Sequence, residues 1–120
     1  MQIAISILIG LIALAHFYIL WFEMFAWTTR GPKVFRQLPA DSFEKSKVLA
    51  ANQGLYNGFL AAGLTWTFFI EDPQWQTNVA LFFLGCVAVA GIYGSLTAAK
   101  KIFYLQASPA MIAMGLILIN

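Results

Sequence analysis

The sequence has few charged residues and few side chains that hold metals or form covalent cross-links. Of its 120 residues, 10% are charged and 61% are hydrophobic, whereas a soluble domain carries about 25% charged residues. The single cysteine, Cys86, excludes a disulfide within the chain, and the only histidine, His16, has no second imidazole or thiolate at metal-ligand spacing. The net charge of +2 is too small to indicate nucleic acid. We therefore expect an integral membrane protein with no metal, cofactor or nucleic-acid partner.

The hydrophobic residues form four segments on the scale of a bilayer about 30 Å thick. We expect these helices at about residues 2–27, 42–70, 76–98 and 103–120. The fourth either begins near Ile102 and is disturbed at Pro109, or is a short helix that begins at Ser108. We favour a start between Phe103 and Gln106. The sequence thus predicts an all-α polytopic protein, a single membrane domain built as an antiparallel four-helix bundle.

Local signals mark the boundaries of the first connection, residues 28–47. The first apolar segment lacks a basic start and a cleavage site, so we expect a retained helix and no signal peptide. Gly31-Pro32 is expected to end this helix. Asp41 followed by Glu44 resembles a capping box and predicts that the second helix begins near Ser42.

The basic residues are distributed unevenly over the connections. Five of the seven lie in the first connection and two in the third, residues 99–105, whereas the second contains Glu71 and Asp72. Cytoplasmic loops are enriched in Lys and Arg. We therefore place the first and third connections in the cytoplasm and both termini outside, in a multi-pass protein. Three apolar residues of the first connection can share one side of a helical turn at the membrane surface, namely Val34, Phe35 and Leu38.

Polar side chains from several predicted spans share one depth. Counted from the cytoplasmic end of each helix at about 1.5 Å per residue, they lie in the inner half of the bilayer. Because such groups are costly in hydrocarbon without partners, we expect them to face protein or water. We predict that five of them line a cytoplasm-facing ligand pocket: Glu23, Gln53, Tyr56, Asn57 and Tyr93. The secondary candidates are His16, Trp27, Asn52, Thr97 and Gln106.

Glu23 is the only acidic residue predicted inside a span, and several roles fit it. It can serve a proton-linked relay, balance the charge of a cationic ligand, or act as a general base. It can equally lie at the interface or hold neighbouring helices together by polar contact. His16 fits a packing residue better than a metal ligand. The sequence leaves the protonation state of Glu23 open.

Small residues recur at every fourth position on two predicted helices, a pattern typical of close helix–helix contact. Such a stripe can pack within the chain or join copies in a homo-oligomer. The second helix carries Ala50, Gly54, Gly58 and Ala62, and the third carries Cys86, Ala90, Gly94 and Ala98 together with Gly91, Ser95 and Ala99.

Four motifs taken together point to a known family. They are Glu23-Met24-Phe25-x-Trp27-Thr28, Asn52-Gln53-Gly54-x-Tyr56-Asn57-Gly58-x-Leu60-Ala61, Ala90-Gly91-x-Tyr93-Gly94 and Gln106-x-x-Pro109-Ala110. Over nearly the whole chain the combination resembles the small bacterial integral membrane proteins catalogued as domain of unknown function 1304. The resemblance implies a four-helix fold in the bacterial cytoplasmic (inner) membrane and brings no established activity with it.

A weaker similarity is to the membrane-associated glutathione and eicosanoid enzymes, which are short, trimeric four-helix proteins with a cytoplasmic first loop. Their glutathione sites use arginines within or beside the membrane. Here the only arginines are Arg30 and Arg36 in the first connection, so a thiolate or carboxylate lacks its expected partners.

Three functions follow from these observations. The leading hypothesis is a non-enzymatic protein of the lipid bilayer that binds or moves a small amphiphilic or cationic molecule at the inner-leaflet pocket. The second is an enzyme acting on a lipid-soluble substrate, with Glu23 or Tyr93 in acid–base work, although no nucleophile–base pair is recognisable. The third is a structural or accessory subunit. The identity of any ligand or substrate is left open.

Overall fold

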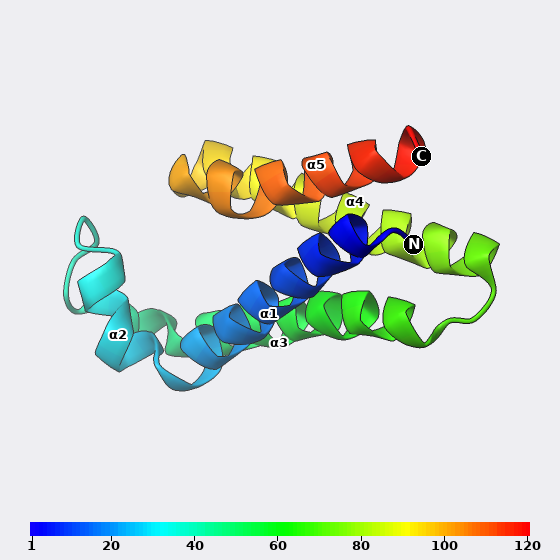
Figure 1. Cartoon of the computed structure of the whole chain (residues 1–120). Helices are drawn as coiled ribbons and strands as arrows, with labels where there is room; N and C mark the ends of the chain where they lie inside the picture. Colours follow the sequence, from blue (N-terminus) through cyan, green and yellow to red (C-terminus); the bar gives the residue numbers. More distant parts are fainter. The chain divides into compact units, whose positions relative to one another are not determined.

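The computed structural model describes residues 1–120 as helices joined by short connections, with no strand (Figure 1). The predicted all-α class is confirmed. The elements in chain order are α1 (Ile3–Phe25), α2 (Trp27–Val34), α3 (Ser42–Trp66), the 3₁₀ turn η1 (Thr67–Phe69), α4 (Pro73–Thr97), the π-helical η2 (Phe103–Ala107) and α5 (Ser108–Leu118).

The chain divides into two compact units, which we name after the helices that lie wholly within them. The α2 unit consists of residues 15–59, and the α4–α5 unit consists of residues 1–14 together with residues 60–120. The division falls inside α1 and inside α3, so each of these helices contributes one part to each unit.

Two helices, α1 and α4, are long and apolar enough to cross a membrane. They have 23 and 25 residues, which correspond to about 34 and 37 Å of helix. In each, 28% of the most apolar window is buried inside the protein. The final helical stretch, Phe103–Leu118, is apolar and shorter. The amides of α3 lower its hydropathy, since asparagine and glutamine are among the most polar uncharged side chains.

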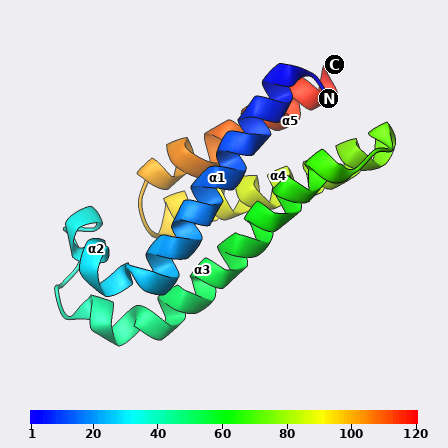
Figure 2. The same ribbon diagram turned by 60° about the horizontal axis from the view of Figure 1, so that its bottom comes forward.

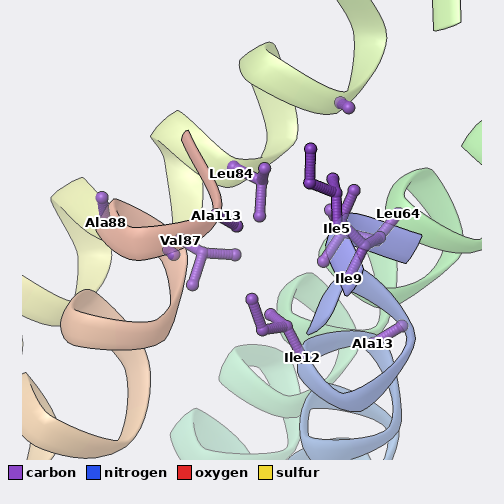
Figure 3. Packing of buried hydrophobic residues seen from close by; sticks show 11 residues of the cluster. Ile5, Ile9, Ile12, Ala13, Leu64, Leu84, Val87, Ala88 and Ala113 are labelled. Carbon is purple, nitrogen blue, oxygen red and sulfur yellow. The ribbon is translucent and has the colours of Figure 1, made fainter. Parts of the chain in front are cut away.

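The α4–α5 unit contains the hydrophobic core of the protein (Figure 3). Apolar residues three or four apart share one face of a helix, and each contributing helix follows this spacing. The cluster comprises Ile5, Ile9, Ile12 and Ala13 of α1, Leu64 of α3, Ala80, Leu84, Val87 and Ala88 of α4, and Ala110 and Ala113 of α5. The alanines of α5 let its backbone approach α4, and the two helices lie side by side in Figure 1.

The connection between α3 and α4 is closed by a capped turn. The Asp72 carboxylate accepts a hydrogen bond of 2.9 Å from the Trp75 backbone N–H, and Pro73 occupies the first turn of α4. An acceptor at the N-cap followed by proline is a common helix start, because the first backbone N–H groups have no partner within the helix. Helix α4 therefore begins at Pro73, three residues before the start expected from the sequence at Gln76.

Helix α5 is continuous with the π-helical turn η2. Proline lacks an N–H and its ring crowds the carbonyl group four residues earlier. For Pro109 that carbonyl belongs to Leu105, which lies inside η2. The wider π turn relieves this crowding, so the helical backbone runs without a break into α5. It begins at Lys101, before the interval favoured by the sequence and beside the alternative start at Ile102.

Polar side chains at one end of the α4–α5 unit join three segments that are far apart in sequence. The Gln2 side-chain amide donates a hydrogen bond of 2.6 Å to Asn120 Oδ1, so the two ends of the chain lie together (Figure 2). The Met1 ammonium lies 3.4 Å from Gln76 Oε1, and the Gln76 amide donates to the Thr67 carbonyl at 3.0 Å. The start of the chain, its last residue and the α3–α4 connection therefore meet.

The first helix ends earlier than the sequence suggested. The expected stop at Gly31-Pro32 is wrong, because α1 ends at Phe25 and Pro32 lies inside α2. The break is at Ala26 (φ −126°, ψ 11°). We attribute it to aromatic packing, since a turn here brings Trp27 back against the ring of Phe22 at 5.8 Å between centroids.

The start of α3 at Ser42 coincides with the expected position, but Asp41 does not cap it as a capping box would. The Asp41 carboxylate forms an ion pair of 3.0 Å with Lys45, one turn further on. The Ser42 hydroxyl donates instead to the Pro39 carbonyl at 2.6 Å and tightens the turn that precedes the helix.

Candidate functional site

The candidate site lies where α1 and α3 touch inside the α2 unit. A methyl group placed on Gly54 would lie 2.9 Å from both Glu23 Cβ and Met24 Cγ and 3.1 Å from the Leu20 carbonyl oxygen. A methyl group on Gly58 would meet the Leu20 side chain. Only glycine allows the two backbones to come this close. The stripe of small residues on the second predicted helix is therefore used for packing within the chain.

This contact holds a carboxyl–amide pair. Asn57 Nδ2 donates a hydrogen bond of 2.8 Å to Glu23 Oε1 and another of 3.1 Å to the backbone carbonyl of Gln53. Asn57 is 8% exposed, and Glu23 is half-buried. Both protons of the amide are thus used, which fixes the orientation of the Asn57 side chain and of the carboxyl group that it holds.

Two oxygen atoms of the pair have no donor within the protein. Glu23 Oε2 and Asn57 Oδ1 receive no hydrogen bond, and neither is fully enclosed by protein. Both ion pairs of the chain lie elsewhere, between Lys45 and Asp41 and between Lys47 and Glu44. The site therefore presents hydrogen-bond acceptors with no neighbouring cation, an arrangement that complements an ammonium group or another donor.

Within the α2 unit, the structure joins two of the predicted ligand-binding side chains, Glu23 and Asn57, by a hydrogen bond. The side chains of Gln53 and Tyr56 are not part of it. The exposed side chain of Gln53 lies about 40° from Asn57 around α3, on the same flank of the helix contact. Tyr56 lies about 100° from Asn57, is 58% exposed and packs edge-on against Phe59. Tyr93 belongs to the α4–α5 unit, where it is 69% exposed.

The secondary candidates have separate local roles. His16 is buried in the α2 unit, and the Trp27 indole N–H donates to Ser46 Oγ at 2.9 Å. Asn52 and Thr97 are exposed, and each donates to a carbonyl group one turn earlier in its own helix, at 2.9 and 2.8 Å. Gln106 is half-buried within η2. No three His, Cys, Asp or Glu side chains come together as a group that could hold a metal ion.

An open depression of about 380 Å³ borders the other flank of the α1–α3 contact. It is lined by Met24, Lys47, Val48, Ala51, Asn52 and Leu55. Around α3, Ala51 and Leu55 lie about 120° or more from Asn57, so the depression and the Glu23–Asn57 pair lie on opposite sides of Gly54. The carboxyl–amide pair is consequently a surface site on the helix contact, and the depression is a separate feature.

Sequence reasoning missed the aromatic cluster that shapes the first connection. The Trp27 ring lies within 6 Å of the rings of Phe22, Phe35 and Phe43, with centroid separations of 5.8, 5.9 and 5.3 Å. Gly31 leaves room for the Phe43 ring, because a methyl group on Gly31 would lie 2.7 Å from Phe43 Cδ1. The signal was present in the high aromatic content of residues 17–43, but its partners are far apart in sequence.

A second missed feature is the return of Arg30 to α1. Arg30 Nε donates a hydrogen bond of 2.6 Å to the Tyr18 hydroxyl, and its guanidinium carbon lies 5.9 Å from the centre of the Tyr18 ring. The twelve-residue separation hides this pairing in the sequence. The sequence predicts that Arg30 lies in the first connection, whereas the structure places it in α2 and against the side of α1.

Comparison with known proteins places this geometry in a family. The family model described as "Protein of unknown function (DUF1304)" matches residues 10–118. The chain belongs to this family. A relative from Lactococcus lactis, "Uncharacterized protein YpaA", is 36% identical over 116 residues, which cover 95% of this chain and 96% of the relative. No solved structure matches the chain. The family resemblance inferred from the sequence motifs is therefore confirmed, and the matched range includes the whole α2 unit.

Proposed function

We propose that this member of the family is a four-span protein of the bacterial inner membrane that binds a small amphiphilic cation at Glu23. Four helices, namely α1, α3, α4 and η2 with α5, would form an antiparallel bundle with both termini outside. The proposal is carried by one observation. Asn57 of α3 binds the carboxyl group of Glu23 on the apolar helix α1. Glu23 Oε2 and Asn57 Oδ1 accept no hydrogen bond from the protein.

The distribution of exposed apolar surface supports insertion in a membrane. In the most apolar 18-residue stretch of α1 and of α4, only 28% of the residues are buried inside the protein. Large side chains on these surfaces include Ile3 at 79% and Leu96 at 80% exposure. In water such surfaces would cost free energy in proportion to their area, whereas lipid tails cover them.

The orientation is supported by the meeting of three polar segments. The positive-inside rule places the start of the chain, its end and the α3–α4 connection outside the cell. These three segments share hydrogen bonds at one end of the α4–α5 unit, through Gln2 with Asn120 and through Met1 and Thr67 with Gln76. An even number of crossings requires both ends of the chain to lie on the same side of the membrane.

The depth of Glu23 supports an amphiphilic ligand. It lies two residues before the end of α1 at Phe25, at the level where the inner leaflet meets the cytoplasm. A molecule with a cationic head and an apolar body would place its charge on the free acceptor oxygens and its body against neighbouring lipid-facing surface. Gln53, on the same flank, would add a hydrogen-bonding group, whereas Tyr56 lies about 100° from Asn57 around α3 and points to a different side of the helix.

Self-association would use surfaces other than the glycines of α3. Gly54 and Gly58 already contact α1, and Gly91 and Gly94 contact η2 and its neighbour Ile102. Of the small residues noted on α4, Ala90 and Ala98 are exposed. A homo-oligomer, which transport of the cation would need in so small a protein, would therefore form on that face of α4.

The binding proposal is tested by ligand-dependent thermal stability of the full chain in a non-ionic detergent. With dodecyltrimethylammonium or tetraphenylphosphonium as probe, we expect the wild-type Tm to rise by about 5 °C at saturating concentration. Glu23→Gln can still accept the Asn57 hydrogen bond, so its own Tm should change little while the response to the cation disappears. Glu44→Gln is the matched control, because it removes an exposed carboxylate outside the site and should keep the full response.

The opposite result has a clear meaning. If no organic cation stabilises the wild type, and Glu23→Gln lowers the Tm as much as Asn57→Leu does, the pair only joins two helices. The protein would then fit a structural or accessory subunit.

The orientation is tested separately by cysteine labelling in a Cys86→Ser background. Gln37→Cys in the first connection should react with a membrane-impermeant maleimide only in inverted vesicles. Gln74→Cys at the start of α4 should react only in right-side-out vesicles or intact cells. Labelling of both from the same side would contradict the four-span topology.

A further inference from the structure

The apolar side of α2 is occupied inside the α2 unit. Trp27 and Phe35 pack on Phe22, and Trp27 also packs on Phe43, which is 2% exposed. Of the three residues that the sequence suggested at the membrane surface, Phe35 packs against Phe22 and Trp27, whereas Leu38 is 42% exposed. Because the aromatic cluster fixes the rotation of α2, the flank of the helix beside this apolar side is presented in a defined direction.

That flank is basic and has no acidic partner: Arg30 lies about 60° and Lys33 about 120° from Trp27 around α2. Arg30 and Lys33 are three residues apart and share a helix face, and Arg36 follows the end of α2. All three are exposed, and residues 24–40 contain no acidic residue. The other cations of the first connection are already paired, Lys45 with Asp41 at 3.0 Å and Lys47 with Glu44 at 2.5 Å. The unneutralised charge is thus concentrated at α2.

Among Arg30, Lys33 and Arg36, only Arg30 is positioned by another side chain. Its Nε donates to the Tyr18 hydroxyl at 2.6 Å, which leaves its two terminal nitrogens without an acceptor in the protein. Tyr18 lies seven residues before the end of α1, about 10 Å along the helix. The guanidinium fork is therefore held against the first span, beside Trp21, whose ring lies 5.8 Å from that of Tyr18.

We propose that Arg30 binds the phosphate of an anionic phospholipid in the inner leaflet. The two free guanidinium nitrogens match two phosphate oxygens, and Lys33 with Arg36 supplies the surrounding positive charge. Tyr18 and Trp21, which are 45% and 47% exposed, lie along the adjoining surface of α1, where the glycerol and upper acyl chain of the lipid would pack. The site rests on the proposed membrane insertion, but it is separate from the cation site at Glu23.

The charge and the surroundings select this occupant. The basic side of α2 continues directly into exposed aromatic surface on a helix that is apolar enough to span a membrane. A phospholipid with a negatively charged headgroup offers both the anion and the apolar body that such a surface complements. A zwitterionic lipid supplies the same phosphate with a compensating cation, so it should bind more weakly.

The experiment uses the full chain in non-ionic detergent and measures lipid retention by native mass spectrometry together with the Tm. We compare phosphatidylglycerol with phosphatidylcholine of the same acyl chains, and inorganic phosphate serves as the third probe. The wild type should retain phosphatidylglycerol preferentially and gain about 5 °C in Tm. Arg30→Gln should weaken that binding about tenfold, as expected for loss of a charge-assisted fork.

Three further variants distinguish phosphate binding at a positioned Arg30 from general attraction of the anionic lipid by the positive charge of the first connection. Arg36→Gln removes the same charge from an arginine whose Nε bonds only a backbone carbonyl, that of Lys33, and should weaken binding by no more than about twofold. Arg30→Lys keeps the charge without the fork and should fall between them. Tyr18→Phe keeps the ring and removes the hydroxyl that orients Arg30, so it should weaken binding without lowering the lipid-free Tm.

Several results would overturn the inference. These are equal losses in Arg30→Gln and Arg36→Gln, equal retention of the two lipids, or the same Arg30-dependent stabilisation by inorganic phosphate alone. The cation site is read independently, since Glu23→Gln should keep phosphatidylglycerol binding and Arg30→Gln should keep the response to organic cations. Loss of both responses in both variants would instead indicate a common folding defect and would contradict the separate lipid site.

Discussion

Glycine brings two helical backbones together at two places in this chain, once between α1 and α3 and once between α4 and η2. At Gly54 the neighbouring atoms include Glu23, whose carboxyl group is bound by Asn57. At Gly91 they are the backbone nitrogen, Cα and methyl group of Ala107. The second contact is as close as the first, and none of its three nearest atoms belongs to a polar side chain. Close packing therefore does not account for the Glu23–Asn57 pair, which requires a reason of its own.

The largest effect is expected at the apolar contact. In Gly91→Ala the new methyl group would lie 2.6 Å from the Ala107 backbone nitrogen, which cannot move away as a side chain could. We expect a loss of about 3 kcal/mol in the free energy of unfolding, measured by titration with sodium dodecyl sulfate in mixed micelles. Gly85→Ala in the same helix is the control, because nothing lies within 4 Å of its added methyl group. It should stabilise by up to about 1 kcal/mol. Equal effects of the two changes would contradict the close contact.

The polar contact should be somewhat more tolerant. In Gly54→Ala the methyl group meets Cβ of Glu23, Cγ of Met24 and the backbone oxygen of Leu20, so α1 must shift. We expect a loss of about 2 kcal/mol in the same titration, together with loss of cation binding as Glu23 moves away from Asn57. Gly58→Ala meets only the end of the Leu20 side chain, which can rotate. A larger loss in Gly58→Ala than in Gly54→Ala would show that the contact is arranged differently.

The carboxyl–amide hydrogen bond is expected to contribute less than the packing around it. A double-mutant cycle with Glu23→Ala and Asn57→Ala should give a coupling energy of about 1 kcal/mol, typical of hydrogen bonds between membrane helices. A coupling energy near zero would mean that the 2.8 Å hydrogen bond makes no net contribution to folding. The pair would then be kept entirely for binding.

The smallest effect concerns the aromatic cluster that holds α2. Trp27→Phe keeps a ring in the cluster and removes the indole N–H that donates to Ser46. We expect a loss of about 0.5 kcal/mol, and Ser46→Ala should add little to it when both changes are combined. Full additivity of the two losses would indicate that they act through different contacts.

The parts of the fold that follow from local chemistry were predictable, and those that depend on distant partners were not. The start of α3 at Ser42 lies at the predicted position, and the last helical stretch begins at Lys101, next to the alternative start predicted at Ile102. The break at Ala26 was not predicted, because it depends on rings as far away as Phe43. For the candidate site, the number of residues from the end of each predicted helix indicated that Glu23 and Asn57 lie at a similar level along their helices. The same count does not give the direction of a side chain around the helix, and it is this direction that separates Tyr56 from Glu23 and Asn57.

The wide turn at Phe103–Ala107 has a consequence for the length of the chain. A π turn contains one residue more than an α-helix would use to keep the same faces in register. A deletion of one residue here would restore an ordinary helix while Ala110 and Ala113 kept their positions against α4. It would also bring a backbone carbonyl group back against the ring of Pro109, so the deletion has to be combined with Pro109→Ala. The number of residues in this turn therefore depends on position 109: the extra residue is needed when position 109 is proline and can be removed when it is not.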